Sequence, residues 1–249
     1  MFKLKNLSIG YQQPIAQDLN LHIGKQQIVA LLGANGCGKT TLLKTLLGLI
    51  PPLQGEILIE NRPHFAWQKH ELAQRIGYVP QGQQKQFGFS VLEMVLMGRT
   101  AYLPWFATPK QVDKNIALQA LMQLGVAHLA SKPYHALSGG ERQLVLIARA
   151  LAQQTKCLLM DEPTSNLDFG NQVMLLEQIQ CLRQQGLTVL FTTHQPEQAY
   201  RYANHVILFH QGKILAQGNP EEVMTLSHLA NIYHLPEQVL QKNLHLKRE

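Results

Sequence analysis

The chain has 249 residues, enough for one sizeable core, and its 45% hydrophobic and 15% charged residues are typical of an ordinary globular protein. This composition excludes a disordered chain, and the longest apolar runs are far shorter than the roughly 18 residues of a membrane-spanning helix. The net charge of +6 is spread along the sequence, so we interpret it as a solvated basic surface and not as a nucleic-acid patch.

The first residues, MFKLKNLSIGY, carry two lysines but lack the apolar region of a secretory signal, which predicts a cytoplasmic location. The three cysteines lack disulfide or metal spacing, which indicates free thiols in a reducing compartment. The histidines are scattered without the spacing of a metal site, so we interpret them as surface or core residues.

Short β-type runs alternate with helical segments along the chain, which predicts an α/β fold. Between about residues 90 and 137 the apolar spacing is helical only, as for Val91 and Val95, so we expect a helical lobe inserted into one domain of residues 1–249, with a helical end at about 219–249. The expected strands are Lys3–Ile9, Leu19–Ile23, Gln27–Leu32, Glu56–Glu60, Ile76–Pro80, Cys157–Asp161, Thr188–Thr192, His205–His210 and Lys213–Gln217.

A glycine-rich loop, GANGCGKT at residues 33–40, follows the run Gln27–Leu32 and opens a helix expected over Thr41–Leu49. Its glycines let successive N–H groups face the β- and γ-phosphates of a nucleotide, Lys39 bridges those phosphates, and the Thr40 hydroxyl ligates Mg²⁺. A turn without a ligand is the alternative, and the Lys-Thr pair in register disfavours it. The predicted nucleotide-binding residues are Gly33, Ala34, Asn35, Gly36, Cys37, Gly38, Lys39, Thr40 and Thr41.

Two adjacent acids, Asp161 and Glu162, end the apolar run that begins at Cys157. At the carboxyl edge of a parallel sheet, Asp161 is expected to hold Mg²⁺. Adjacent strand residues point to opposite sides, so Glu162 is free to orient or deprotonate the attacking water. For the acids alone, a solvated strand end is a credible alternative.

The segment LSGGE at residues 137–141 precedes a helical run. Ser138 is suited to cap that helix, while Gly139 and Gly140 expose backbone N–H groups to an anion. Taken by itself, such a Ser-Gly-Gly cap is usually structural.

In chain order, the loop at 33–40, Gln81, the LSGGE segment, the acidic pair, the segment SNLD at 165–168 and His194 form a set that resembles the ATP-binding cassette (ABC) family over essentially the whole chain. The resemblance implies a P-loop NTPase core with an antiparallel β portion and an inserted helical subdomain. It also implies that Tyr11 stacks on adenine, that Gln81 links the γ-phosphate site to the lobe and ligates Mg²⁺, and that His194 contacts the γ-phosphate. The implied catalytic residues are Lys39, Gln81, Glu162 and His194.

In this family, two cassettes meet head to tail around ATP, which implies a homodimer in which Ser138, Gly139, Gly140 and Asp168 contact the ATP of the other copy.

The run SVLEMVLMGR at residues 90–99 resembles importer subunits for iron-siderophore, haem, cobalamin, and some metal or oxyanion uptake. We therefore expect an ATPase on the cytoplasmic face of the inner membrane, with permease subunits and, indirectly, a periplasmic or extracellular binding protein as partners. The aromatic segment Tyr102–Phe106 either docks a membrane subunit or packs within the lobe. The alternative function is a soluble ABC ATPase acting on nucleic acid or ribosomes.

Overall fold

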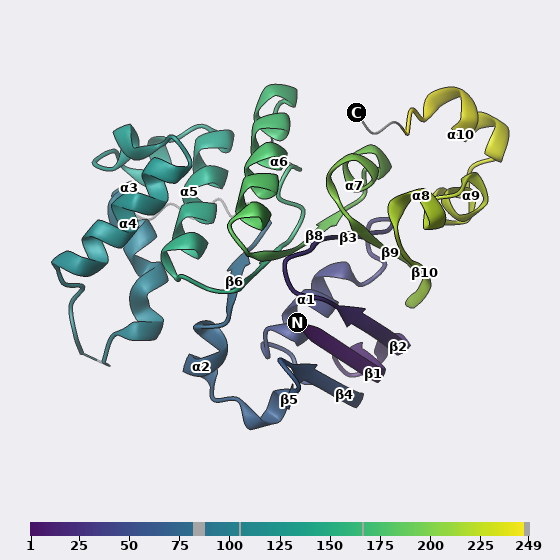
Figure 1. Cartoon of the computed structure of the whole chain (residues 1–249), viewed down its shortest axis with the longest axis horizontal. Coiled ribbons are helices and arrows are strands. Elements are labelled where there is room, and N and C mark those ends of the chain that lie inside the picture. The colour runs from purple at the N-terminus through teal and green to yellow at the C-terminus, as the bar shows by residue number, and fades with distance from the viewer. Residues whose placement is uncertain (82–87, 105, 166, 247–249) are drawn as a thin grey trace. The chain divides into compact units, whose positions relative to one another are not determined.

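The computed structural model describes residues 1–81, 88–104, 106–165 and 167–246. It divides the chain into two compact units: the first combines Met1–Trp67 with Ile179–Glu249, and the second is Gln68–Gln178. Strands and helices occur in both units, which confirms the α/β class (Figure 1). The predicted lobe at residues 90–137 lies within the second unit, and two residues of the predicted segments, Trp105 and Asn166, lie outside the described residues.

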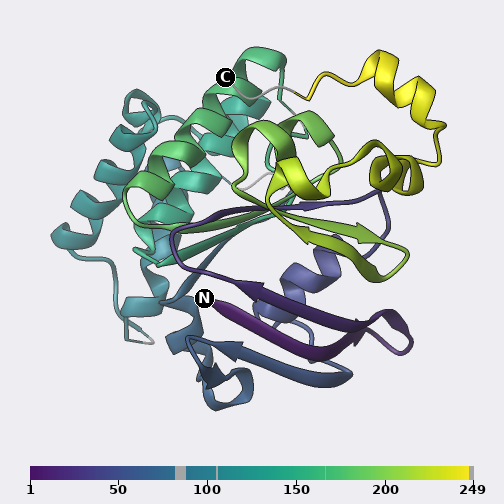
Figure 2. The same ribbon diagram turned by 45° about the vertical axis from the view of Figure 1, so that its right-hand side comes forward.

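The first unit contains the antiparallel portion of the fold, a sheet in the order β2-β1-β4-β5 (Figures 1 and 2). Its first strand shows why the sequence favours this structure: Phe2 and Leu4 are buried, whereas Lys3 and Lys5 on the opposite face are exposed. The strands are β1 (Phe2–Gly10), β2 (Pro14–Ile23), β4 (Gln54–Ile59) and β5 (Arg62–Pro63).

This unit also contributes four strands, in the order β10-β9-β3-β8, to a second, six-stranded sheet. Strand β3 is parallel to both β8 and β9, while β10 is antiparallel to β9. Every residue of β3 and β8 is buried, as is typical of parallel strands covered on both faces. Leu32 pairs with Thr193, so the carboxyl ends of β3 and β8 lie side by side. The strands are β3 (Ile28–Leu32), β8 (Thr188–Thr193), β9 (His205–His210) and β10 (Lys213–Gly218).

Helix α1 (Lys39–Leu46) follows β3 and buries its leucines in the core. The helix begins two residues before the predicted Thr41 and ends three before Leu49. It ends early because Gly48 has a φ of 71° and turns the chain, so that Leu49 N–H donates back to Lys44 O at 2.9 Å. The other helical elements of this unit are a 3₁₀ turn (His64–Ala66), α7 (Pro196–Tyr202), α8 (Pro220–Val223), α9 (Leu226–Tyr233) and α10 (Glu237–Asn243).

The second unit contains the parallel pair β6 (Ile76–Val79) and β7 (Cys157–Met160). Three helices of the unit, α3, α4 and α5, pack against one another. Its helical elements are α2 (Lys69–Ala73), α3 (Val91–Leu96), α4 (Gln111–Gln123), α5 (Gly139–Ala152), the 3₁₀ segments Met97–Tyr102, Ala127–Leu129 and Tyr134–Ala136, and α6 (Phe169–Gln184), which extends into the first unit.

A buried arginine ties these helices together. The Arg99 Nε donates to Asp113 Oδ1 at 3.0 Å, and its Nη1 donates to Ala152 O at 2.8 Å and to Gln154 Oε1 at 3.0 Å. The guanidinium also lies 4.1 Å from the centre of the Tyr102 ring. The Lys110 N–H and the Arg99 guanidinium keep the pKa of Asp113 below its usual range, so the carboxylate stays charged. This network anchors the carboxyl end of α5, whose amino end carries the LSGGE segment.

Candidate nucleotide-binding site

The phosphate loop connects β3 to α1 in the first unit. Gly36 and Gly38 have φ values of 78° and 108°, a left-handed conformation that favours glycine. Gly33 is required for a different reason: a Cβ there would lie 2.4 Å from Phe209 O in β9. The loop is therefore a compact turn whose shape depends on its glycines.

The amino end of α1 has the features of an anion site. Gly38, at the cap position, supplies no side-chain hydrogen bond. The helical ladder begins with Leu42 N–H donating to Gly38 O at 3.0 Å, so the N–H groups of Lys39, Thr40 and Thr41 precede it. Thr40 is exposed, whereas the Thr41 side chain is buried, so any phosphate contact of Thr41 comes from its backbone.

The Lys39 ammonium group folds back over the loop. Its Nζ donates to Gly33 O at 2.8 Å and to Ala34 O at 3.0 Å, and the residue is 5% exposed. These carbonyls hold the positive charge above the loop, where a phosphate accepted by the loop N–H groups needs a counter-charge.

Tyr11 lies on the turn between β1 and β2 and is 61% exposed. The start of β2 borders the phosphate loop, since a Cβ on Gly38 would lie 2.9 Å from Ile15 Cγ2. An exposed aromatic ring four residues before Ile15 is available to stack on a flat base.

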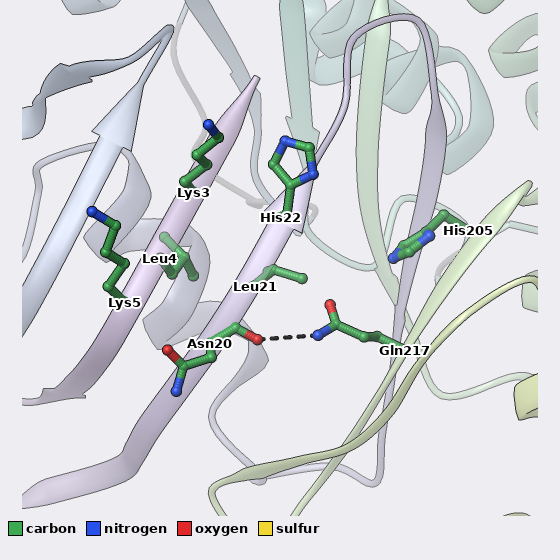
Figure 3. A pocket seen from close by; sticks show the side chains of 8 residues that line it. All are labelled: Lys3, Leu4, Lys5, Asn20, Leu21, His22, His205 and Gln217. Carbon is green, nitrogen blue, oxygen red and sulfur yellow. Dashed lines mark hydrogen bonds between the residues drawn. The ribbon is translucent and has the colours of Figure 1, made fainter.

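Strand β2 is held in place by the β9–β10 hairpin. Gln17 N–H donates to Gly212 O at 3.1 Å, and Gln217 Nε2 donates to Asn20 O at 3.1 Å (Figure 3). Between these strands lies an open hollow of about 540 Å³. None of its lining residues belongs to the nucleotide motifs, so we interpret the hollow as a surface groove where β2 meets the β9–β10 hairpin. It is lined by Lys3, Leu4, Lys5, Asn20, Leu21, His22, His205 and Gln217.

His194 follows β8, beside the phosphate loop of the same unit. Its neighbour Thr193 connects the two segments: Gly33 N–H donates to Thr193 O at 3.3 Å, and Gln195 N–H donates to Thr193 Oγ1 at 3.0 Å. The parallel pairing of β3 with β8 thus brings the loop and His194 to one edge of the sheet, as expected for strand ends in a parallel sheet.

The acidic pair lies at the end of β7 in the second unit. Asp161 is 2% exposed, and its N–H donates to Val79 O at 2.9 Å. Burial and the negative charge of Asp161 raise the pKa of Tyr78 to about 12. A buried carboxylate at a strand end is the arrangement expected of a cation ligand.

The prediction that strand alternation orients Glu162 is wrong. Strand β7 ends at Met160, and Glu162 has a φ of 42°, so a left-handed backbone sets the direction of its side chain. The Glu162 carboxylate meets Gln81, whose Nε2 donates to Glu162 Oε2 at 3.3 Å. Two predicted catalytic residues from different loops therefore lie together.

The LSGGE segment forms the amino end of α5, and the prediction that Ser138 caps this helix is confirmed. Ser138 Oγ accepts from Glu141 N–H at 3.2 Å, and Glu141 Oε2 accepts from Ser138 N–H at 2.8 Å. This reciprocal pair is a capping box, and the Ser-x-x-Glu spacing could have predicted the part played by Glu141.

Asn171 was not singled out from the sequence, but it joins Gly140 to Asp168. A Cβ on Gly140 would lie 2.9 Å from Asn171 Nδ2. The Asn171 N–H donates to Asp168 Oδ1 at 2.9 Å, and its Nδ2 donates to Asp168 Oδ2 at 2.8 Å. These donors lower the pKa of Asp168, so its carboxylate is charged at neutral pH. The two motifs implied to act on a partner's nucleotide are thus joined within one unit.

The predicted site residues are divided between the two units. The first unit contains Tyr11, the loop at 33–41 and His194, and the second contains Gln81, 138–140, Asp161, Glu162 and Asp168. Among the residues described, no helix combines the length and the apolar character needed to cross a bilayer.

Comparisons with known proteins agree with this set of motifs. The ABC transporter family matches residues 16–165. The chain is 43% identical to the molybdate import ATP-binding protein MolC of Haemophilus influenzae, over 94% of this chain and 88% of that protein. It is 37% identical to the ferric enterobactin transport ATP-binding protein FepC of Escherichia coli, over 93% and 86% of the two chains. The structure resembles that of a metal-chelate type ABC transporter in an inward-facing conformation, with a TM-score of 0.85 and 42% identity over 94% and 89% of the chains. The chain therefore belongs to the ABC transporter family, in which it is an ATP-binding subunit that hydrolyses ATP.

Proposed function

We propose that this subunit powers a bacterial importer of a metal chelate, a cofactor or an oxyanion, and that it works on the cytoplasmic face of the inner membrane, bound to permease subunits. The similarity to molybdate and ferric enterobactin subunits along almost the whole chain carries this proposal. A periplasmic or extracellular binding protein is an indirect partner. The transported substrate contacts the other subunits, so the residues of this chain do not select it.

In the proposed hydrolytic site, the N–H groups of the phosphate loop and Lys39 bind the phosphates of ATP. When bound, Mg²⁺ would neutralise negative charge on the phosphates. The oxygen atoms of Thr40, Gln81 and Asp161 fit the preference of this ion for hard ligands. Glu162 orients the attacking water, and His194 contacts the γ-phosphate.

The proposed active form is a homodimer with two-fold symmetry. The described residues contain one phosphate loop and one LSGGE segment, so a lone chain supplies half of what the head-to-tail arrangement requires. In this dimer Ser138, Gly139, Gly140 and Asp168 contact the ATP bound by the other copy. The capped α5 terminus and the Asn171 link hold these residues in place on each subunit.

For the permease contact we propose Phe106, which is 94% exposed. Tyr102, from the same aromatic segment, has its hydroxyl bonded to Gln153 O at 2.8 Å and its ring under Arg99, which supports the lobe-packing alternative for that residue. An almost fully exposed phenylalanine is typical of an interface anchor, and removing such an anchor at a hot spot commonly costs about 2 kcal/mol.

The test compares Phe106→Ser with Phe65→Ser, a matched control because Phe65 is 87% exposed and lies in the first unit. Each variant is coexpressed with the membrane subunits, and copurification and basal ATPase rate are measured. Phe106→Ser is expected to lose assembly while keeping basal ATPase activity, and Phe65→Ser is expected to keep both. Equal assembly by both variants would show that Phe106 is not an anchor of the permease interface. Copurification with ribosomes or nucleic acid in place of membrane subunits would favour the alternative function.

A further inference from the structure

The segment that carries His194 is anchored on one side by the phosphate loop, through Gly33 N–H and Thr193 O. The hydrogen bond from Gln195 N–H to Thr193 Oγ1 closes the turn around His194 itself. These contacts fix the residues before and after His194. A contact to the peptide carbonyl of His194 therefore sets the orientation of a residue whose two neighbours are already held in place.

That carbonyl accepts a hydrogen bond from the carboxyl-terminal part of the chain. Tyr233 Oη donates to His194 O at 2.8 Å. The two residues are 39 positions apart, and neither β8 nor α9 (Figure 1) requires this contact for its own backbone hydrogen bonding. The bond connects the helices that follow β10 to the segment proposed to contact the γ-phosphate.

Tyr233 has a well-defined position because α9 packs against β9 and buries Leu229 and Ile232 completely. The helix begins at a Thr225 cap, where Thr225 Oγ1 accepts from His228 N–H at 3.2 Å. It ends at Tyr233, since His234 has a φ of 54° and turns the chain into the left-handed region.

The tyrosine hydroxyl remains protonated, and so remains a donor, at any physiological pH. Burial raises the pKa of Tyr233, and the charge of the Cys37 thiolate, when formed, raises it further. Because Cys37 is part of the phosphate loop, the Tyr233 hydroxyl lies within electrostatic range of that loop while it contacts the His194 carbonyl.

We propose that Tyr233 is a positioning residue for ATP hydrolysis, whose hydroxyl holds the His194 backbone in the orientation that directs the imidazole toward the γ-phosphate. The inference rests on the proposed role of His194. It assigns a function to the carboxyl-terminal helices, which carry none of the nucleotide motifs.

The first test is Tyr233→Phe, which removes the hydroxyl and keeps the ring. We expect kcat to fall roughly two- to tenfold, the effect of one lost neutral hydrogen bond, with little change in KM for ATP because the phosphate loop is intact. Thr155→Val is the matched control: it removes a buried hydroxyl that donates to Cys157 O at 3.1 Å in the second unit, and it should leave kcat unchanged. An unchanged kcat in Tyr233→Phe overturns the proposal.

The second test places Tyr233→Phe in a His194→Ala background and follows γ-phosphate release in single turnovers long enough to measure residual activity. If Tyr233 acts through His194, the second substitution causes no further loss. The same fold loss in both backgrounds overturns the proposal, because the effect would then bypass His194. Normal hydrolysis by His194→Ala alone would overturn both the role of His194 and this inference, whereas an inactive His194→Ala beside a fully active Tyr233→Phe would overturn the inference alone.

Discussion

Two glycines with nearly the same φ, one in the phosphate loop and one outside it, allow a matched comparison. Gly36 has a φ of 78° and Gly125, after α4, has a φ of 72°, and a Cβ added at either position meets no atom within 4 Å. In the left-handed conformation, Gly36→Ala and Gly125→Ala therefore carry similar strain and no steric clash. A left-handed alanine costs roughly 1–2 kcal/mol. Where the turn stays left-handed, as we expect for Gly125→Ala, a chain of this size loses about 2–8 °C in Tm.

The two variants should differ once ATP is present. For Gly36→Ala we expect the loop to relax out of the left-handed turn in the absence of nucleotide, so that little of the strain lowers its Tm there, whereas its N–H groups face the phosphates only when the turn is restored. ATP binding to Gly36→Ala then includes the strain, which weakens affinity roughly 5- to 30-fold. Gly125→Ala should lose stability to the same extent with and without nucleotide.

The assay is thermal unfolding of both variants and the parent with and without saturating Mg-ATP, together with direct titration of nucleotide. The expected result is a smaller ATP-induced rise in Tm for Gly36→Ala and a normal rise for Gly125→Ala. Equal ATP-induced stabilisation of the two variants would refute the argument that phosphate binding requires the left-handed turn at Gly36.

Two further predictions concern stability in acid and the shared site. The Lys110 N–H and Arg99 lower the pKa of Asp113 in the folded state. The stabilising effect of its carboxylate is therefore present above the unfolded pKa of about 3.9 and is lost as the pH falls through the lower folded pKa. In urea unfolding, the difference in stability between the parent and Asp113→Asn should then disappear in acid. A gap of constant size across that range would contradict this assignment. Lys39→Ala mixed with Ser138→Arg should form nucleotide-dependent dimers with one intact composite site, as light scattering can detect. No more dimer in the mixture than in either variant alone would argue against head-to-tail sharing.

The sequence predicted the strands well because their signal is local. The run at 28–32 is apolar throughout and is buried throughout, and the alternation at 2–5 gives alternating burial. The end of α1 was predicted three residues too late, since Leu47 and Leu49 continue the apolar pattern while Gly48 breaks the helix. Propensity does not reveal where a single left-handed residue stops a leucine-rich segment.

The motif residues of the site were also readable from the sequence, but the contacts that orient them were not. The left-handed backbone of Glu162 has no signature in the residue itself. The bond from Tyr233 to His194 depends on which elements pack together, because it joins residues 39 positions apart. The approach of Asn171 to Gly140 is likewise non-local. Two contacts do lie within recognisable local patterns: the capping box of Glu141 with Ser138, and the bonds from Asn171 to Asp168, which directly precedes α6 and accepts as a helix cap does.

The most direct test of the proposed ATP-bound dimer is the oligomeric state of Glu162→Gln in saturating Mg-ATP, measured by light scattering together with phosphate release. The substitution removes the carboxylate proposed to orient water and leaves Lys39, Thr40 and Asp161 to bind the nucleotide. Glu177→Gln, a change at an exposed position of α6, is the matched control and should hydrolyse ATP like the parent. We expect a stable ATP-bound dimer with most turnover lost. A Glu162→Gln protein that stays monomeric in ATP, or that releases phosphate at a near-normal rate, would contradict it.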